Sequence, residues 1–230
     1  GYHALSFGFL LGEVIRRATG QTIGEYVREQ VSGPVGAEFM IGVPPADLER
    51  VAPLIEFSLE DMSADAGADA MITAIMTPGT PTHQAFMLAP VLPTSFNEPA
   101  MLQAEIPSAN GCTSARSLAR IYGALVAEVD GTRLLSAAQV DEARTLQSEG
   151  DDLVMVNEPN IIGNGFFLSD PTSLQLGAGS FGHSGMGGSF GCALPEREIG
   201  FGYVMNQMVP DLRGDPRSRG LMDAVLACTE

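Results

Sequence analysis

The sequence predicts an α+β fold, in which helices come first and an antiparallel sheet with a covering helix follows. Apolar residues recur at spacings of three and four between Phe7 and Ala18, which indicates an amphipathic helix. Two apolar runs, 189–194 and 199–205, flank a polar turn that contains proline and predict a β-hairpin. Residues 215–227 have the pattern of a final helix. This order favours separate helical and sheet regions over alternating β and α units.

The first helix is expected over residues 5–18. Its apolar stripe consists of Phe7, Leu10, Leu11, Val14, Ile15 and Ala18. Gly20 ends this helix, and the capping-box pair Thr22 and Glu25 opens a second one that runs to about Val31. Gly33-Pro34 ends the second helix.

The middle of the chain has less periodicity. Residues 41–51 contain Pro44-Pro45 and predict a connector, and residues 58–65 predict a short acidic helix. From residue 66 to residue 110 we expect loops and short helices that wrap a surface. Long irregular segments of this kind either form a binding cleft or are structural excursions, and the sequence leaves both interpretations open.

Regular elements return after residue 112. Thr113 is expected to cap a helix over 114–129, whose inward side chains are Leu118, Ile121, Tyr122 and Leu125. A capping box at Ser136 and Gln139 opens a helix to about Leu146, and the apolar residues 161–168 predict a buried strand. In the final helix, Leu221, Val225 and Leu226 are expected on one side. We therefore divide the chain into a helical, loop-rich lobe (1–160) and a lobe of strands with a helix (161–230).

Composition excludes several classes of function. The 230 residues are 45% hydrophobic, but no uninterrupted apolar run is long enough to span a membrane. A net charge of -16 argues against nucleic acid, which needs basic residues to neutralise its phosphates. The three cysteines are expected to be free thiols, and neither they nor the three histidines have metal-ligand spacing. We therefore expect no metal and no cofactor, and a small molecule as the partner.

The candidate site lies in the glycine-rich segment 181–188, just before the hairpin. Glycine at this density lets the backbone approach a ligand closely. His183, the hydroxyl of Ser184 and free backbone N–H groups could together form a reaction site. The alternative is a glycine-rich strand corner that contains a buried histidine.

Two further motifs match known patterns only in part. Gly187 to Gly191 fits the G-x-S-x-G pattern, but Ser189 enters a strand pair and no histidine follows it, so we interpret the match as chance. Ser108-Ala109-Asn110 imitates a serine-x-asparagine motif of penicillin-recognising enzymes. Without partner motifs in the chain, we interpret it as an Asn-Gly turn.

Three segments together carry a family resemblance: YHALSFGFLLGEVIRRATG, PSANGCTSARSLARIYGAL and FGHSGMGGSFGCALPEREIGFGYVMN. In this order they resemble the class C β-lactamase-like serine hydrolases, especially the family VIII carboxylesterases, over nearly the whole chain. That family has a tyrosine opening a helix and a Lys-Thr-Gly or His/Trp-x-Gly triplet on a strand near the C-terminus. The implied fold is a helical lobe plus an antiparallel sheet flanked by helices, as in β-lactamases and penicillin-binding proteins, incomplete at the N-terminus.

The resemblance assigns roles to particular residues. Tyr2 is the tyrosine that carries a proton to and from the serine nucleophile, which requires a nearby positive charge to favour its phenolate. His183 replaces the lysine of the triplet, and Ser184 and Gly185 complete the triplet in the pocket. The backbone N–H of Met186 is one oxyanion donor, and the nucleophile's own N–H is the other.

Departures from the family pattern shape the expected function. Ala4 stands where β-lactamases have asparagine, and Lys-Thr-Gly is His-Ser-Gly, so both changes favour ester hydrolysis over β-lactam turnover. All 12 basic residues are arginines, so the Ser-x-x-Lys motif of the family is expected in an upstream segment. Without that segment, we expect the 230-residue chain to be inactive. We also expect it to leave an apolar edge of its sheet uncovered.

We therefore expect a serine hydrolase that acts on small carboxylic esters through an acyl-enzyme. The alternatives are a non-catalytic binding or scaffold protein of the same fold and a penicillin-binding or D-peptidase activity. No signal peptide is visible, which favours the cytoplasm. The sequence does not predict the oligomeric state.

Overall fold

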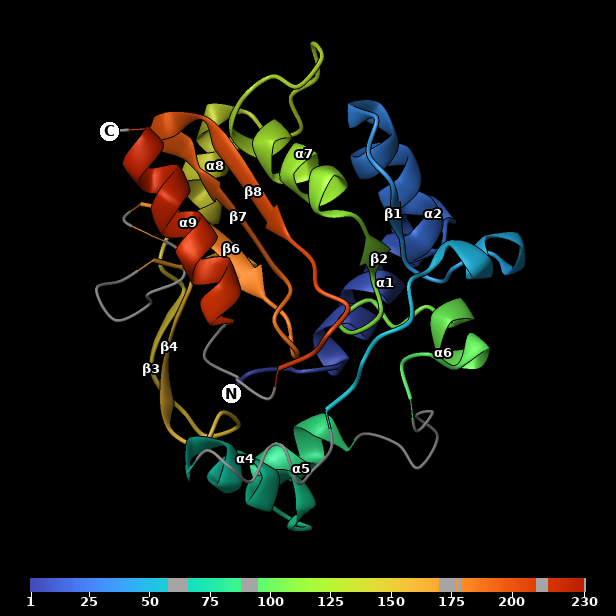
Figure 1. The fold of residues 1–230 in the computed structure, drawn as a ribbon, viewed down its shortest axis with the longest axis vertical. Coiled ribbons are helices and arrows are strands. Elements are labelled where there is room, and N and C mark those ends of the chain that lie inside the picture. The colour runs from blue at the N-terminus through green and yellow to red at the C-terminus, as the bar shows by residue number, and fades with distance from the viewer. Residues whose placement is uncertain (58–65, 88–94, 170–176, 178, 210–214, 230) are drawn as a thin grey trace.

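The computed structural model describes residues 1–57, 66–87, 95–169, 177, 179–209 and 215–229, and Figure 1 shows its fold. Helices come first and the strands of the main sheet follow, which confirms the predicted α+β order. The described elements are α1 (Ser6–Thr19), α2 (Ile23–Val27), the π-helix η1 (Arg28–Ser32), the 3-10 helix η2 (Gly33–Val35), β1 (Phe39–Met40), the 3-10 helix η3 (Pro45–Arg50), α4 (Ala66–Met76), α5 (Pro81–Phe86), α6 (Pro99–Gln103), β2 (Cys112–Thr113), α7 (Ala115–Val126), α8 (Ala137–Ala143), β3 (Ser148–Asp152), β4 (Glu158–Ile162), β5 (Phe167–Leu168), β6 (Phe181–Ser184), β7 (Phe190–Leu194), the 3-10 helix η4 (Pro195–Arg197), β8 (Ile199–Tyr203) and α9 (Pro216–Cys228).

The main sheet has six strands in the order β3-β4-β5-β6-β7-β8, and every neighbouring pair is antiparallel. The predicted hairpin is confirmed as β7 and β8 joined by η4. Helix α9 covers one face of the sheet, and α7 and α8 cover the other (Figure 1). A hydrophobic cluster lies on each face, one around Phe190 and Met222 and the other around Phe181 and Val140. β8 is an edge strand, and no described strand pairs with its outer side.

Strand β8 has large apolar side chains on one face and glycines on the other. Ile199, Phe201 and Tyr203 pack against the cluster beneath α9. The alternating residues Gly200 and Gly202 face α7, where an added Cβ would collide with the helix backbone. Because successive residues of a strand point to opposite faces, these glycines let α7 lie directly on the sheet.

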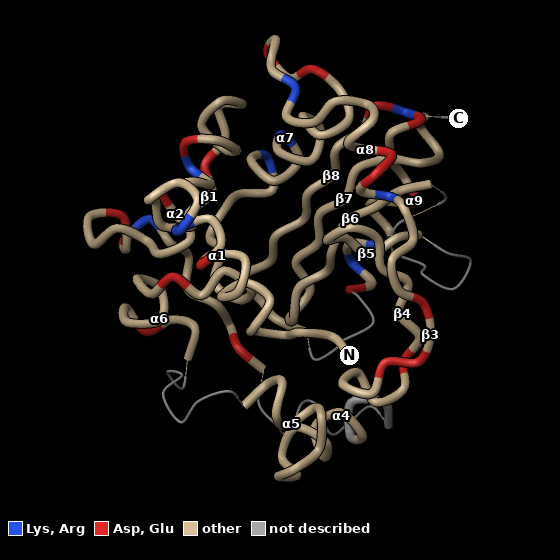
Figure 2. Tube along the Cα trace, turned by 180° about the vertical axis from the view of Figure 1, so that it is seen from behind, with Lys and Arg blue, Asp and Glu red and all other residues tan. Residues whose placement is uncertain are grey.

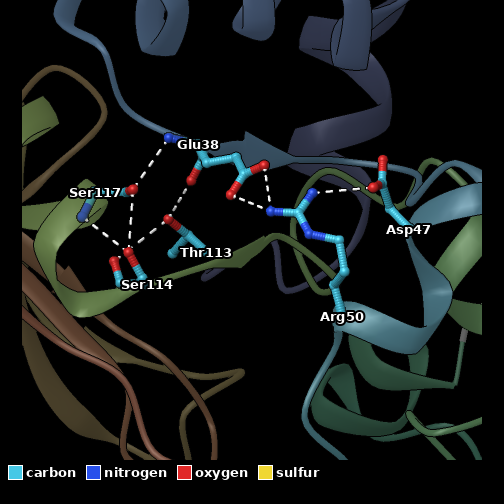
Figure 3. Close-up of polar contacts among 6 residues, drawn as sticks. All are labelled: Glu38, Asp47, Arg50, Thr113, Ser114 and Ser117. Atoms are coloured by element: carbon cyan, nitrogen blue, oxygen red, sulfur yellow. Dashed lines mark hydrogen bonds and ion pairs between the residues drawn. The ribbon is translucent and has the colours of Figure 1, made fainter.

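Strand β1 is tied to the start of α7. Strand β1 pairs with β2, and the backbone N–H of Glu38 donates to Ser117 Oγ (3.0 Å) while Thr113 Oγ1 donates to the Glu38 carbonyl (2.7 Å) (Figure 3). Arg50 extends this network by pairing with the Glu38 and Asp47 carboxylates. These ion pairs are exposed, so they contribute little stability, and the buried Ser117 contact is the firmer connection.

The structure confirms the predicted span of helix α1 to within one residue, but the apolar stripe of this helix is exposed. Four members of the stripe are between 46% and 62% exposed, namely Phe7, Leu10, Leu11 and Val14. The side of α1 that packs closely is marked by Gly8, where an added Cβ would lie 2.6 Å from Ser108 Oγ. In the described part of the chain, α1 therefore presents its most apolar face outward.

Several predicted helix boundaries need correction. Thr113 lies in β2 with its hydroxyl committed to Glu38, so Ser114 caps α7 instead, accepting from Ser117 N (3.1 Å). Helix α7 ends at Val126, short of residue 129, and α8 ends at Ala143, short of Leu146. The capping boxes at Thr22 and Ser136 are confirmed.

The prediction of one buried strand over 161–168 was wrong. A turn at Gly163-Asn164-Gly165 splits the segment between β4 and β5, and Gly165 has a φ of 91° that few other residues adopt. Strand β3 was not predicted, because its residues are almost all polar. In α9, Met222 is the buried side chain and Leu221 is exposed, contrary to expectation.

Residues 66–110 contain loops and the short helices α4, α5 and α6, as predicted. The buried hydroxyl of Thr82 on α5 donates to the Val154 carbonyl (2.8 Å), which attaches this segment to the turn between β3 and β4. Whether the segment forms a binding cleft stays open. The helix expected over 58–65 lies outside the described residues, and the division into lobes at residue 160 stays a prediction.

No helix in the described ranges combines the length and the apolar character needed to cross a membrane.

Candidate active site

The structure brings Tyr2 and His183 together, although 181 positions separate them in the chain. Tyr2 lies in the segment just before α1, and His183 lies on β6, the strand before the hairpin. The distance from Tyr2 Oη to His183 Nε2 is 3.1 Å, which is a hydrogen bond. Both side chains are partly buried, so this bond is shielded from solvent.

The second ring nitrogen determines the direction of that bond. His183 Nδ1 lies 2.6 Å from the backbone carbonyl of Ser184, and a carbonyl can only accept. The proton of a neutral imidazole is therefore on Nδ1, and Nε2 accepts from the Tyr2 hydroxyl. Burial lowers the pKa of His183 below its ordinary value, which favours this neutral form despite the hydrogen bond to Ser184.

An aromatic side chain supports both members of the pair. Phe167 on β5 stacks on Tyr2 with ring centroids 5.9 Å apart and lies 4.7 Å from the His183 ring. Its strand neighbour across the β5–β6 pair is Gly182, the residue before His183. This role was not predicted, because Phe167 belongs to an apolar run that was expected to form a buried strand.

The surroundings of Tyr2 keep its phenol protonated. Burial raises the pKa of Tyr2, and the negative charge of Asp152 raises it further. Within the described residues, the titratable side chains that interact with this phenol are His183 and Asp152, and neither is a cation. The positive charge that the resemblance requires beside Tyr2 is thus not supplied by these residues.

Asp152 is the second site neighbour that the sequence did not predict. Its carboxylate is 7% exposed and accepts from Val154 N (2.8 Å), Met155 N (3.2 Å) and Asn160 Nδ2 (2.9 Å). Burial pushes the pKa of Asp152 upward, but hydrogen bonds from the backbone of Tyr2, from Val154 and from Asn160 outweigh burial and hold it below its ordinary value. Acidic residues are frequent along β3 (Figure 2), so nothing in the sequence distinguished this one.

The predicted oxyanion segment follows β6 in a tight turn. Ser184 pairs with Phe190, and the Gly185 N–H donates to the Ser189 carbonyl (2.7 Å). Met186 is exposed, and no described group accepts from its backbone N–H. The next two residues have φ angles of 91° and 118°, which only glycine adopts easily, so the turn depends on Gly187 and Gly188.

The two partial motifs have structural roles. Ser189 leads into β7 and not into a helix, which confirms that the G-x-S-x-G match is chance. The buried Asn110 amide donates to the Met101 (2.7 Å) and Ala104 (2.5 Å) carbonyls, so it braces a loop. Over the described ranges, no group of His, Cys, Asp and Glu could hold a metal ion, and all three cysteines are free thiols.

Comparisons with known proteins identify the family of this chain. The beta-lactamase family model matches residues 1–225. The esterase/beta-lactamase LipL of Mycobacterium tuberculosis is 33% identical over an alignment of 225 positions, which covers 92% of this chain and 49% of that protein. The chain thus spans about half the length of this curated relative.

Solved structures extend the comparison to the fold. A family VIII carboxylesterase is 35% identical, with a TM-score of 0.79 over 99% of this chain and 58% of the other. A penicillin-binding protein homolog from Caulobacter crescentus is 33% identical, with a TM-score of 0.78 over the same shares. Both confirm the predicted fold of β-lactamases and penicillin-binding proteins. The chain belongs to the beta-lactamase family.

Proposed function

We propose that these residues form the tyrosine-bearing part of a serine hydrolase that cleaves small carboxylic esters through an acyl-enzyme. The observation that carries the proposal is the 3.1 Å hydrogen bond between Tyr2 and His183, the two residues with assigned catalytic roles. The esterase and carboxylesterase names of the similar proteins support the same class of reaction.

The geometry of the pair suggests how protons move during acylation. The serine hydroxyl attacks the ester carbonyl and gives its proton to Tyr2 Oη, while Tyr2 passes its own proton to His183 Nε2. The protons then return in reverse order, so that Tyr2 protonates the departing alcohol oxygen as the acyl-enzyme forms. General acid–base transfer of this kind contributes about 10²–10⁴-fold to the rate.

The oxyanion of the tetrahedral intermediate needs backbone donors. We assign one to the Met186 N–H, which faces no acceptor among the described residues, and the other to the nucleophile's own N–H. Ser184 and Gly185 complete the wall of the pocket between His183 and this donor. One such donor is worth roughly 2.7–4 kcal/mol in the transition state.

The nucleophilic serine and its lysine are proposed to lie in an upstream segment of the same protein. Three features support this: the phenol has no cation beside it, the stripe of α1 is exposed, and the outer edge of β8 is unpaired within the described residues. A lysine placed near Tyr2 would lower the pKa that burial raises, which makes it easier for the phenol to release its proton to His183 during attack. We propose that without this segment the chain is inactive.

The polar groups of the site favour uncharged esters over β-lactams. His183 is neutral where β-lactamases carry a lysine, and Asp152 adds a negative charge nearby. Ala4, at the position of the β-lactamase asparagine, is 8% exposed and offers no polar group to a substrate. A bound carboxylate would therefore meet no compensating charge from these residues.

The decisive experiment uses the full-length protein. A fluorophosphonate probe should label a serine upstream of Tyr2, and Tyr2→Phe should lower the hydrolysis of short p-nitrophenyl esters by about 10²-fold or more. Tyr26→Phe, which makes the same change on α2, is the matched control and should keep full activity.

Other outcomes identify the alternatives. A scaffold protein would take up no label at serine. A penicillin-binding or D-peptidase activity would show as labelling by a fluorescent penicillin that D-Ala-D-Ala peptides compete away. Full ester hydrolysis by Tyr2→Phe would exclude the role given to Tyr2.

A further inference from the structure

Asp152 is a buried carboxylate for which the proposed reaction has no direct use. It ends β3, and its oxygens accept hydrogen bonds from Val154 N, Met155 N and Asn160 Nδ2. These bonds shape the turn between β3 and β4. A buried anion is costly unless such bonds compensate it, so a carboxylate here calls for a reason beyond turn formation.

The same carboxylate reaches the segment that carries the phenol. The terminal nitrogen of Gly1 lies 4.0 Å from Asp152 Oδ2, and an added Cβ at Gly1 would lie 3.0 Å from Val154 Cγ2. Interaction with the backbone of Tyr2 helps to lower the pKa of Asp152. The β3–β4 turn therefore touches the chain on the N-terminal side of Tyr2, while Phe167 and His183 contact its ring. The backbone contact fixes where residue 2 sits, and the ring contacts fix where its hydroxyl points.

We infer that Asp152 is a positioning residue for Tyr2, whose buried carboxylate holds the backbone of residue 2 at the distance from which the phenol reaches His183. This inference rests on the proposed function of Tyr2. The charge of Asp152 also acts on the phenol, favouring the protonated hydroxyl that donates to His183 in the resting pair. Misplacement of a reacting group by about 1 Å can cost on the order of a hundredfold in rate.

The test is Asp152→Asn in the full-length protein. Asparagine keeps one oxygen for the Val154 and Met155 N–H groups but removes the charge. We expect kcat for a short, uncharged p-nitrophenyl ester to fall by about tenfold or more with little change in KM, since the role proposed for Asp152 is to position Tyr2 and not to bind substrate. Asp151→Asn, the same change at the exposed neighbouring residue, should leave both constants unchanged.

A second readout does not depend on activity. The phenolate absorbance of Tyr2 is obtained by titrating the protein and subtracting its Tyr2→Phe variant. Because a neighbouring negative charge opposes the phenolate, Asp152→Asn should move the Tyr2 titration to lower pH, and Asp151→Asn should not. A purely structural role in the turn would change stability without selectively shifting this titration.

A double variant covers the case in which Asp152→Asn does not fold. Asp152→Asn combined with Asn160→Asp lets the new amide donate to the new carboxylate, so the pair is kept while the charge moves away from Tyr2. The Tyr2 titration should again move to lower pH.

The inference is overturned if the folded variants titrate Tyr2 as the parent does and hydrolyse the ester with the parent kcat. Should Tyr2→Phe itself prove active, the proposed function fails, whereas the titration still decides whether Asp152 acts on the phenol.

Discussion

Strand β6 carries His183, and helix α1 follows the segment that carries Tyr2, but the two elements are held in different ways. β6 lies between β5 and β7 inside the sheet, and its first residue, Phe181, is 0% exposed. α1 packs through Gly8 on one side and leaves Leu10 and Val14 each 62% exposed on another. The strand that carries the imidazole is therefore paired on both sides within the sheet. Helix α1, which follows the phenol, still exposes an apolar face on which another segment could pack.

This difference suggests how the proposed enzyme is divided. The tautomer of His183 is set within its own strand, because the carbonyl of the next residue, Ser184, accepts from Nδ1. Tyr2 is contacted instead from separate elements, by Phe167 on β5 and by His183 on β6. Substitutions in the sheet should therefore lower stability most when they remove its buried core. Substitutions on the exposed face of α1 should lower stability most when a covering segment is present.

The largest effect on stability is expected from Phe181→Ala. Phe181 packs edge-on against Phe166 with ring centroids 4.9 Å apart and lies in the cluster with Val126 and Val140. Removing a fully buried phenyl ring leaves a cavity and should reduce the free energy of unfolding by about 3–5 kcal/mol. Denaturant unfolding followed by circular dichroism measures this loss, and a change below about 1 kcal/mol would mean that the sheet face is not the core described here.

The sequence predicted those parts of the molecule that local patterns encode. The apolar runs 189–194 and 199–205 around a turn with proline predicted the hairpin, and the capping boxes at Thr22 and Ser136 predicted helix starts, because each pattern involves residues close together in the chain. The pairing of Tyr2 with His183 was expected only through the family resemblance, since no local pattern links positions that far apart. Its contact was then found in the structure.

What the sequence missed depends on long-range contacts or on turns. Asp152 is one of several acidic residues on β3, and only folding buries it beside Tyr2. The apolar run 161–168 concealed the Gly163–Gly165 turn that places Phe167 on its own strand. Helical periodicity marked the stripe of α1 correctly, but periodicity cannot say whether a stripe is covered.

A smaller effect is expected where α7 lies on the sheet. In Gly200→Ala, the new methyl group would overlap the backbone of Gly123 and Ala119, and neither can move without shifting the helix. We expect a loss of about 1–3 kcal/mol in the free energy of unfolding. Gly220→Ala on α9 is the matched control, because no atom lies within 4 Å of its added Cβ.

The control should behave in the opposite way. Alanine is favoured over glycine inside a helix, so Gly220→Ala is expected to be neutral or to stabilise by up to about 1 kcal/mol. Equal losses from the two substitutions would contradict the close approach of α7 to β8.

The smallest effect in this chain, and the one that sharpens the comparison most, is expected at Leu10. Because Leu10 is 62% exposed, Leu10→Ala should change the free energy of unfolding of the 230-residue chain by only about 0.5 kcal/mol or less. If an upstream segment packs on the stripe, the same substitution in the full-length protein should cost about 2–5 kcal/mol, as for a buried leucine. Arg17→Ala, on the same helix and highly exposed, should have a small effect in both proteins. Equal small effects of Leu10→Ala in both would show that α1 stays uncovered, and the placement of Tyr2 would then not depend on a covering segment.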